Sequence, residues 1–146
     1  MTKAFAAVTA GAWPDRYTFS PAVRIGDLLF IAGTTATDDR GELVGRGDIV
    51  EQTRQIYRKF AALLAAAGAS LRDIVETTEY VTTTANYKGT ADVRREVFGG
   101  PPYPAATGVI VAGLLREGAL IEISAVAVLR ADSAAPARGP DRFEAP

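Results

Sequence analysis

The chain has 146 residues, of which 48% are hydrophobic and 23% charged, as expected for one globular domain with a sizeable core. It contains neither cysteine nor histidine, which excludes disulfides, thiol nucleophiles, the usual zinc sites and Ser-His-Asp triads. The formal net charge of −1 gives no reason to expect nucleic-acid binding, which depends on clustered Lys and Arg.

Membrane and targeting signals are missing from the pattern as well. No apolar run approaches the roughly 20 residues that cross a bilayer, and residues 1–5 lack the apolar core of a signal peptide. We therefore expect a cytoplasmic protein without a membrane partner. Its chemistry must come from carboxylates, hydroxyls, Arg, Lys, backbone groups or bound water, and we expect neither a metal nor another cofactor.

In chain order, the first regular pattern is a β-hairpin. Two β-favouring stretches, Ala22–Ile25 and Leu28–Gly33, flank Gly26-Asp27. Glycine at the first central position of a two-residue turn is typical of type II′. These stretches are predicted to be adjacent antiparallel strands, and a further strand is considered near Phe5–Val8.

The most regular helical pattern follows a polar, glycine-rich loop over Thr34–Gly47. Asp48 can cap a helix N-terminus, and Glu51 three residues later would complete a capping box. Apolar residues then recur at helical spacing as far as Ala67, and Gly68 is placed to end the helix in a left-handed conformation. Because only one face is apolar, we expect this helix to lie on a sheet.

The second half of the domain adds a strand, a helix and two more strands. In order they are Ile74–Thr82, Asn86–Phe98, about Ala106–Val111 and about Leu120–Leu129. Residues 1–130 are predicted to form a single α+β domain with two helices on one face of a mixed sheet. The other face is too apolar for water, which predicts an oligomer. Residues 131–146 are interpreted as a tail, with disorder as one alternative.

The last predicted strand carries the candidate site. Ile121 and every second residue after it, as far as Leu129, should face the core, so Glu122 lies on the other face beside Leu120 and Val126. A carboxylate on a partly apolar face is costly unless it is paired or used. Two interpretations stay open, namely an edge or interface glutamate held by a salt bridge and a general acid or base.

Other side chains have plainer interpretations. Arg94 and Arg95 are expected on the solvated face of a helix. Trp13 and Tyr17 are expected to be packing residues rather than binding platforms.

Three segments together resemble one known family. They are residues 19–33, residues 52–55 followed by 66–75, and Pro104-Ala105 followed by residues 119–127. In these segments, and in their order over residues 17–130, the chain is similar to RidA/YjgF proteins. The resemblance implies a chorismate-mutase-like fold and a barrel-shaped homotrimer with three clefts, each built by two neighbouring chains. It also implies a deaminase-type hydrolase that converts reactive enamines or imines into ammonia and a keto acid.

The resemblance further implies roles for individual residues. Glu122 occupies the position that orients or activates the attacking water in the family. Deaminating members carry an arginine for the substrate carboxylate directly after the Pro-Ala pair, where this chain has Ala106, whose methyl group cannot bind a carboxylate. Arg24 and Arg116 are therefore candidates for a replacement cation. The substrate-binding positions are Phe19, Ala32, Gly33, Thr34, Ala106, Thr107 and Gly108, with Tyr87 or Tyr103 at the mouth.

Two functions are consistent with this pattern. The first is an imine or enamine deaminase, or a related catabolic hydrolase, that acts on a small molecule. The second is a non-catalytic trimer that binds a small molecule or regulates. A ribonuclease activity is disfavoured by the charge of −1 and by the lack of a basic stripe.

Overall fold

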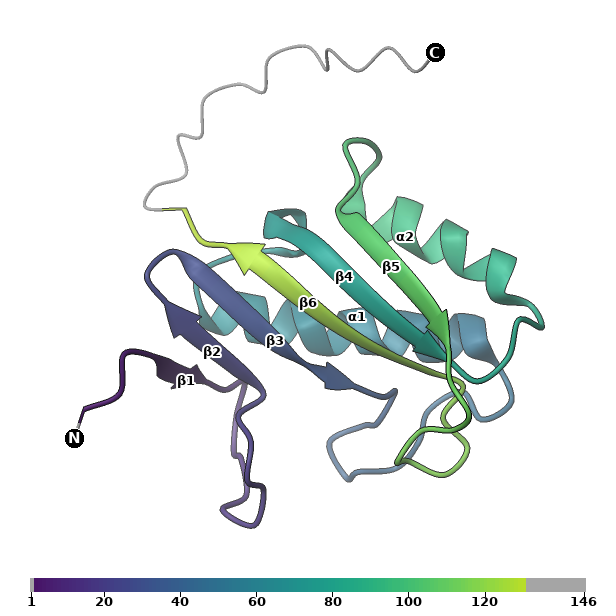
Figure 1. Ribbon diagram of the computed structural model, residues 1–146, viewed down its shortest axis with the longest axis horizontal. Helices are drawn as coiled ribbons and strands as arrows, with labels where there is room; N and C mark the ends of the chain where they lie inside the picture. The colour runs from purple at the N-terminus through teal and green to yellow at the C-terminus, as the bar shows by residue number, and fades with distance from the viewer. Residues whose placement is uncertain (1, 131–146) are drawn as a thin grey trace.

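The computed structural model describes residues 2–130, which form one mixed sheet covered on one face by two helices (Figure 1). The six strands are arranged in the order β1-β2-β3-β6-β4-β5. Only the β4–β5 pair is parallel. This arrangement confirms the predicted α+β fold with both helices on one face, whereas the predicted tail at 131–146 lies outside the described residues.

The elements follow the predicted order closely. The strands are β1 (Ala6–Val8), β2 (Ala22–Ile25), β3 (Leu28–Thr34), β4 (Ile74–Val81), β5 (Ala105–Ile110) and β6 (Ile121–Val128). The helices are α1 (Ile49–Ala66) and α2 (Thr90–Phe98). Two short 3₁₀ turns, η1 (Leu71–Asp73) and η2 (Tyr87–Gly89), directly precede β4 and α2 respectively. No helix among residues 2–130 is both long and apolar enough to span a bilayer.

The second helix begins later than its sequence pattern predicted. Asn86, the expected first residue, has a left-handed backbone with a φ of 62°, a conformation that cannot continue into an α-helix. The chain therefore makes one 3₁₀ turn first, and α2 starts at Thr90.

The predicted type II′ turn between β2 and β3 is confirmed. Ile25 pairs with Leu28, so the turn has two central residues. Gly26 has a φ of 55° while the φ of Asp27 is negative, and a positive φ at the first central residue alone distinguishes type II′ from type I′.

Both predicted ends of α1 are present, but the capping box is only half formed. The Asp48 carboxylate accepts hydrogen bonds from the backbone N–H groups of Val50 and Glu51, at 3.0 and 3.1 Å. The Glu51 side chain does not return the bond: the Asp48 N–H donates to the Gly45 carbonyl at 2.8 Å, and Glu51 pairs with Arg58 at 3.1 Å. At the other end, Gly68 has the predicted left-handed backbone, with a φ of 75°.

Strand β6 lies between β3 and β4, at the centre of the sheet. Its alternate side chains are buried as predicted, and they are Ile121, Ile123, Ala125, Ala127 and Leu129 just beyond the strand. They pack under the apolar face of α1, where Ile56, Phe60 and Leu64 are fully buried. This core determines which side chains of β6 face away from the helices.

The sheet face opposite the helices is open and partly apolar. Leu28, Phe30 and Val128 are 39%, 43% and 37% exposed, although each belongs to a sheet strand. Every residue of the edge strand β5 is also exposed. Monomeric proteins rarely leave such a face and such an edge uncovered.

We expect Asp48→Ala to lower the free energy of unfolding by about 1 kcal/mol, because two N–H groups of the first turn of α1 lose their acceptor. Urea unfolding at a fixed protein concentration measures this change. Asp15→Ala is the control, since Asp15 is exposed and accepts no hydrogen bond from another described residue. Equal destabilisation by the two variants would contradict the capping role.

Candidate functional site

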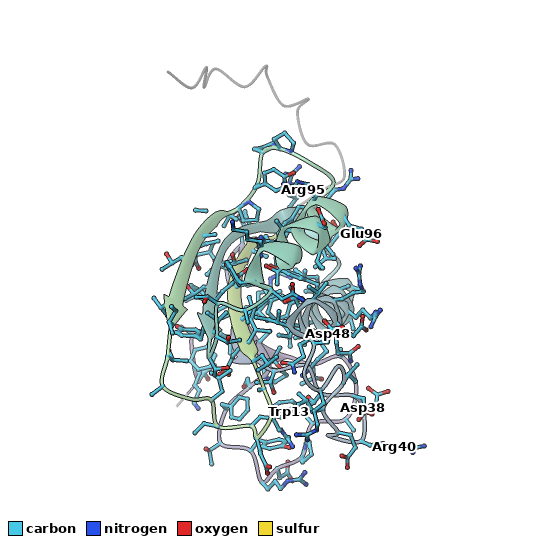
Figure 2. The ribbon with its side chains drawn as sticks, turned by 90° about the vertical axis from the view of Figure 1, so that its right-hand side faces the viewer. Trp13, Asp38, Arg40, Asp48, Arg95 and Glu96 are labelled. Carbon is cyan, nitrogen blue, oxygen red and sulfur yellow. The ribbon has the colours of Figure 1, made fainter. Side chains whose placement is uncertain are left out.

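A cleft of about 480 Å³ opens beside Glu122. Four parts of the chain line it: the N-terminal segment between β1 and β2, the end of β3 with the loop that follows, one side of α1, and the loop between β5 and β6. Figure 2 shows Trp13 at the same end of the molecule as Asp38 and Arg40, far from Arg95 and Glu96 of α2. The cleft therefore lies at one end of the sheet.

Glu122 reaches this cleft across an irregularity in the β3–β6 pairing. Ile31 pairs with Ala125 and Thr34 with Ile123, so β3 contains one more residue than β6 in this interval. Such β-bulges redirect side chains and are frequent beside active sites. At the bulge, a Cβ built on Gly33 would lie 3.1 Å from the Glu122 Oε1 atom. Glycine at this position therefore lets the carboxylate lie directly against the backbone.

Glu122 has no fixed ionic partner in the part of the chain that the structure describes. The salt bridges there join other residues. The interpretation of Glu122 as a glutamate held by a salt bridge therefore finds no support between residues 2 and 130. A half-buried carboxylate without such a partner at a cleft is available to a ligand or to water.

Lys59 of α1 is a second charged group in the cleft, and the sequence interpretation missed it. Its Nζ donates hydrogen bonds to Thr34 Oγ1 at 2.5 Å, to the Thr35 carbonyl at 2.8 Å and to Thr37 Oγ1 at 2.8 Å. The pKa of Lys59 is lowered to about 8, mainly by burial and also by the positive charge of Arg116, while the Glu122 carboxylate opposes the shift.

A signal for Lys59 was present in the helical pattern. Lys59 follows Ile56 by three residues and precedes Leu63 by four, so it lies on the apolar stripe. A lysine in such a stripe indicates a buried or site-facing amine. Only the packed structure shows that this amine joins α1 to the loop after β3.

Three aromatic rings form one wall of the cleft. The ring centroid of Trp13 lies 4.9 Å from that of Tyr17 and 5.3 Å from that of Phe19. The Trp13 Nε1 also donates a hydrogen bond to the Phe19 carbonyl at 2.9 Å. Trp13 and Tyr17 thus pack as expected, although their position at a cleft was not predicted. All three residues line it.

Of the two arginines considered as replacement cations, only Arg116 lies in the cleft. It projects from the loop between β5 and β6. Arg24 does not line the cleft, and its Nε donates to the Gly26 carbonyl at 3.1 Å in the β2–β3 turn.

The predicted site residues fall into two groups within one chain. Phe19, Ala32, Gly33 and Thr34 line the cleft together with Glu122. Ala106, Thr107 and Gly108 lie on β5, which β4 separates from β6. Tyr103 precedes β5 near the start of β4, whereas Glu122 pairs with Tyr80 near the end of β4. The second group therefore does not line the Glu122 cleft of its own chain.

Tyr87, the remaining candidate, lies on the helix side of the sheet. Its hydroxyl donates to the carboxylate of Glu79 at 2.5 Å. Glu79 is only 2% exposed, and Arg94 neutralises it at 3.2 Å. The expectation that Arg94 is solvated was therefore wrong, because a buried carboxylate requires a nearby cation. Arg95 is exposed as expected and pairs with Asp92 at 2.7 Å.

Comparison with known proteins gives the family. The sequence model described as Endoribonuclease L-PSP matches residues 11–129. A crystal structure of a protein of the conserved Rid family from Yersinia pestis superposes with a TM-score of 0.78 at 32% identity, over 86% of this chain and 100% of that one. The chain belongs to the RidA/YjgF family.

Two curated relatives agree with this family. A RutC family protein of Pyrococcus horikoshii is 40% identical over 110 residues, which are 75% of this chain and 85% of the relative. The 3-aminoacrylate deaminase RutC of Acinetobacter baylyi is 29% identical over 117 residues, which are 80% of this chain and 91% of the relative. The family model, which matches residues 11–129, includes the Glu122 strand and the bulge in β3 beside it.

We expect the Lys59 amine to titrate with a midpoint near pH 8, because burial and Arg116 disfavour its charged form. The measurement is the pH dependence of the Lys59 Cε chemical shift in ¹³C-labelled protein. The spectrum of Lys59→Arg, in which this signal is missing, assigns it. A midpoint near the ordinary lysine value of 10.5 would show that the amine is not desolvated.

Proposed function

We propose that this RidA/YjgF protein is an imine or enamine deaminase, a hydrolase in which Glu122 activates water. One observation carries the proposal: the Glu122 carboxylate lies against Gly33 at the cleft without a salt bridge to any described residue. A relative named as a 3-aminoacrylate deaminase, 29% identical to this chain, supports the reaction class.

The proposed reaction needs only acid–base chemistry. Protonation of the β-carbon of an enamine gives an iminium ion, and a substrate that is already an imine needs protonation only at nitrogen. Glu122 then takes a proton from water as the water oxygen adds to the iminium carbon. The same carboxyl group returns that proton to the nitrogen, which leaves as ammonia. As the C–N bond breaks, the hydroxyl proton of the carbinolamine passes to solvent water and the carbonyl forms. This release balances the proton taken up in the first step. One water is consumed for each ammonia released.

We also propose that the working form is a homotrimer in which a neighbouring chain completes each cleft. The uncovered edge strand β5 and the exposed apolar side chains of the open face support this assembly. The separation of Ala106, Thr107 and Gly108 from Glu122 within one chain supports it as well. In this arrangement the β5 residues of one protomer face the Glu122 side of the next.

We expect purified protein to accelerate ammonia release from 2-aminoacrylate generated by a dehydratase, or from members of a panel of cyclic and neutral imines. Glu122→Gln should lower this rate by about 10²-fold or more, because an amide cannot accept the proton of water. Ammonia is measured by a coupled assay. Glu42→Gln is the matched control, since Glu42 is exposed and does not line the cleft.

A second variant tests the position of the carboxylate. Gly33→Ala would place a methyl group 3.1 Å from Glu122 Oε1, so it should also lower the rate while the fold is retained. If no imine in the panel reacts faster than in buffer, the deaminase proposal fails, and the non-catalytic binding trimer becomes the better description.

We expect wild-type protein to sediment as a trimer and Phe30→Asp to shift it toward the monomer. Phe30 lies on the open face and is 43% exposed, so a charge there would be buried in an assembly that covers this face. Sedimentation velocity measures the mass. Ala65→Asp, on the exposed side of α1, should leave the mass unchanged. A monomeric wild type would refute the proposed assembly.

A further inference from the structure

Among the cations of the cleft, Arg116 is the one whose side chain is not already engaged. Arg58 pairs with Glu51 at 3.1 Å and donates to Gln55 at 3.2 Å. Lys59 donates hydrogen bonds to Thr34 at the end of β3 and to Thr35 and Thr37 in the loop that follows. Within residues 2–130, the Arg116 guanidinium makes neither a salt bridge nor a hydrogen bond.

The charge balance near Arg116 favours an anionic ligand. Arg116 lies close enough to Lys59 to disfavour its charged form, which is the effect of two cations on each other. The Glu122 carboxylate acts on the pKa of Lys59 in the opposite direction, and its effect is smaller than that of Arg116. Asp39 is the only other carboxylate among the described lining residues. A ligand carboxylate beside Arg116 would offset the repulsion and match the planar fork of guanidinium donors.

The size and the wall of the cleft indicate the rest of the ligand. A volume of about 480 Å³ lies within the range of roughly 300–1,000 Å³ that encloses drug-sized molecules. The rings of Trp13, Tyr17 and Phe19 stand 4.9 to 5.6 Å from one another, and such rings pack favourably against another planar ring.

We propose that Arg116 binds the substrate carboxylate in place of the arginine missing at Ala106, and that the aromatic wall selects a ring-bearing 2-imino or enamino acid. The anion site thus moves from β5 to the loop between β5 and β6, on the Glu122 side of the sheet. This proposal rests on the deaminase function for the reaction, but ligand binding tests it without turnover.

Three probes separate the two halves of this proposal. Phenylpyruvate has both the ring and the carboxylate of the expected product, phenylacetone lacks the carboxylate, and pyruvate lacks the ring. By titration calorimetry at constant pH, phenylpyruvate should bind at least about tenfold more tightly than either of the others, a difference equivalent to about 1.4 kcal/mol. Equal affinity for phenylacetone would overturn the anion site, and equal affinity for pyruvate would overturn the role of the aromatic wall.

Variants then assign the contacts. Arg116→Gln should weaken phenylpyruvate binding at least tenfold and leave phenylacetone unchanged, and Arg116→Lys should restore part of the loss. Arg24→Gln, outside the cleft, should leave the affinities for phenylpyruvate and phenylacetone unchanged. Trp13→Ala should weaken both ring-bearing probes but not pyruvate. Unchanged phenylpyruvate affinity in Arg116→Gln would refute the assignment.

Turnover distinguishes this proposal from the deaminase function. If the probes and variants behave as expected but no imine releases ammonia, the ligand class stands and the deaminase proposal fails. If 2-aminoacrylate is deaminated efficiently and Arg116→Gln has no effect on that rate, the deaminase proposal stands and the assignment of Arg116 is refuted.

Discussion

The site depends on how β6 pairs with β3, because this pairing brings the Glu122 carboxylate onto the backbone of Gly33. The buried side chains of β6 pin its register, since a slip of one residue would exchange the core face and the open face. The β-bulge between Ile31 and Thr34 then redirects the end of β3, where Gly33 lies against the Glu122 carboxylate. A rigid core on one side of the sheet thus positions a carboxylate on the other.

Two glutamates on neighbouring strands point to opposite faces of the sheet and have different surroundings. Glu79 on β4 points to the helix side, where it is almost fully buried and held by Arg94 and Tyr87. Its oxygens are occupied, which suits a structural role. Glu122 on β6 faces the cleft and has no salt bridge within the described chain. Only the second carboxylate lines the cleft.

Because position 106 is alanine and not arginine, a substrate carboxylate would have to bind to another cation of the cleft. Lys59 braces the loop after β3, and Arg116 carries an unused guanidinium beside the same cleft. In the proposed site, acid–base chemistry and carboxylate recognition therefore come from the Glu122 side of one chain. The neighbouring chain would then close the cleft, without having to supply the charge.

The sequence by itself determined the features that depend on local chemistry: the type II′ turn at Gly26, the ends of α1 at Asp48 and Gly68, and the two faces of β6. Side-chain period and backbone preference act over a few residues, so these could be predicted. Only the tertiary structure decided that Lys59 and the aromatic rings around Trp13 share a cleft. Their segments are far apart in the chain, and no local pattern encodes how a helix, a loop and a bulged strand come together.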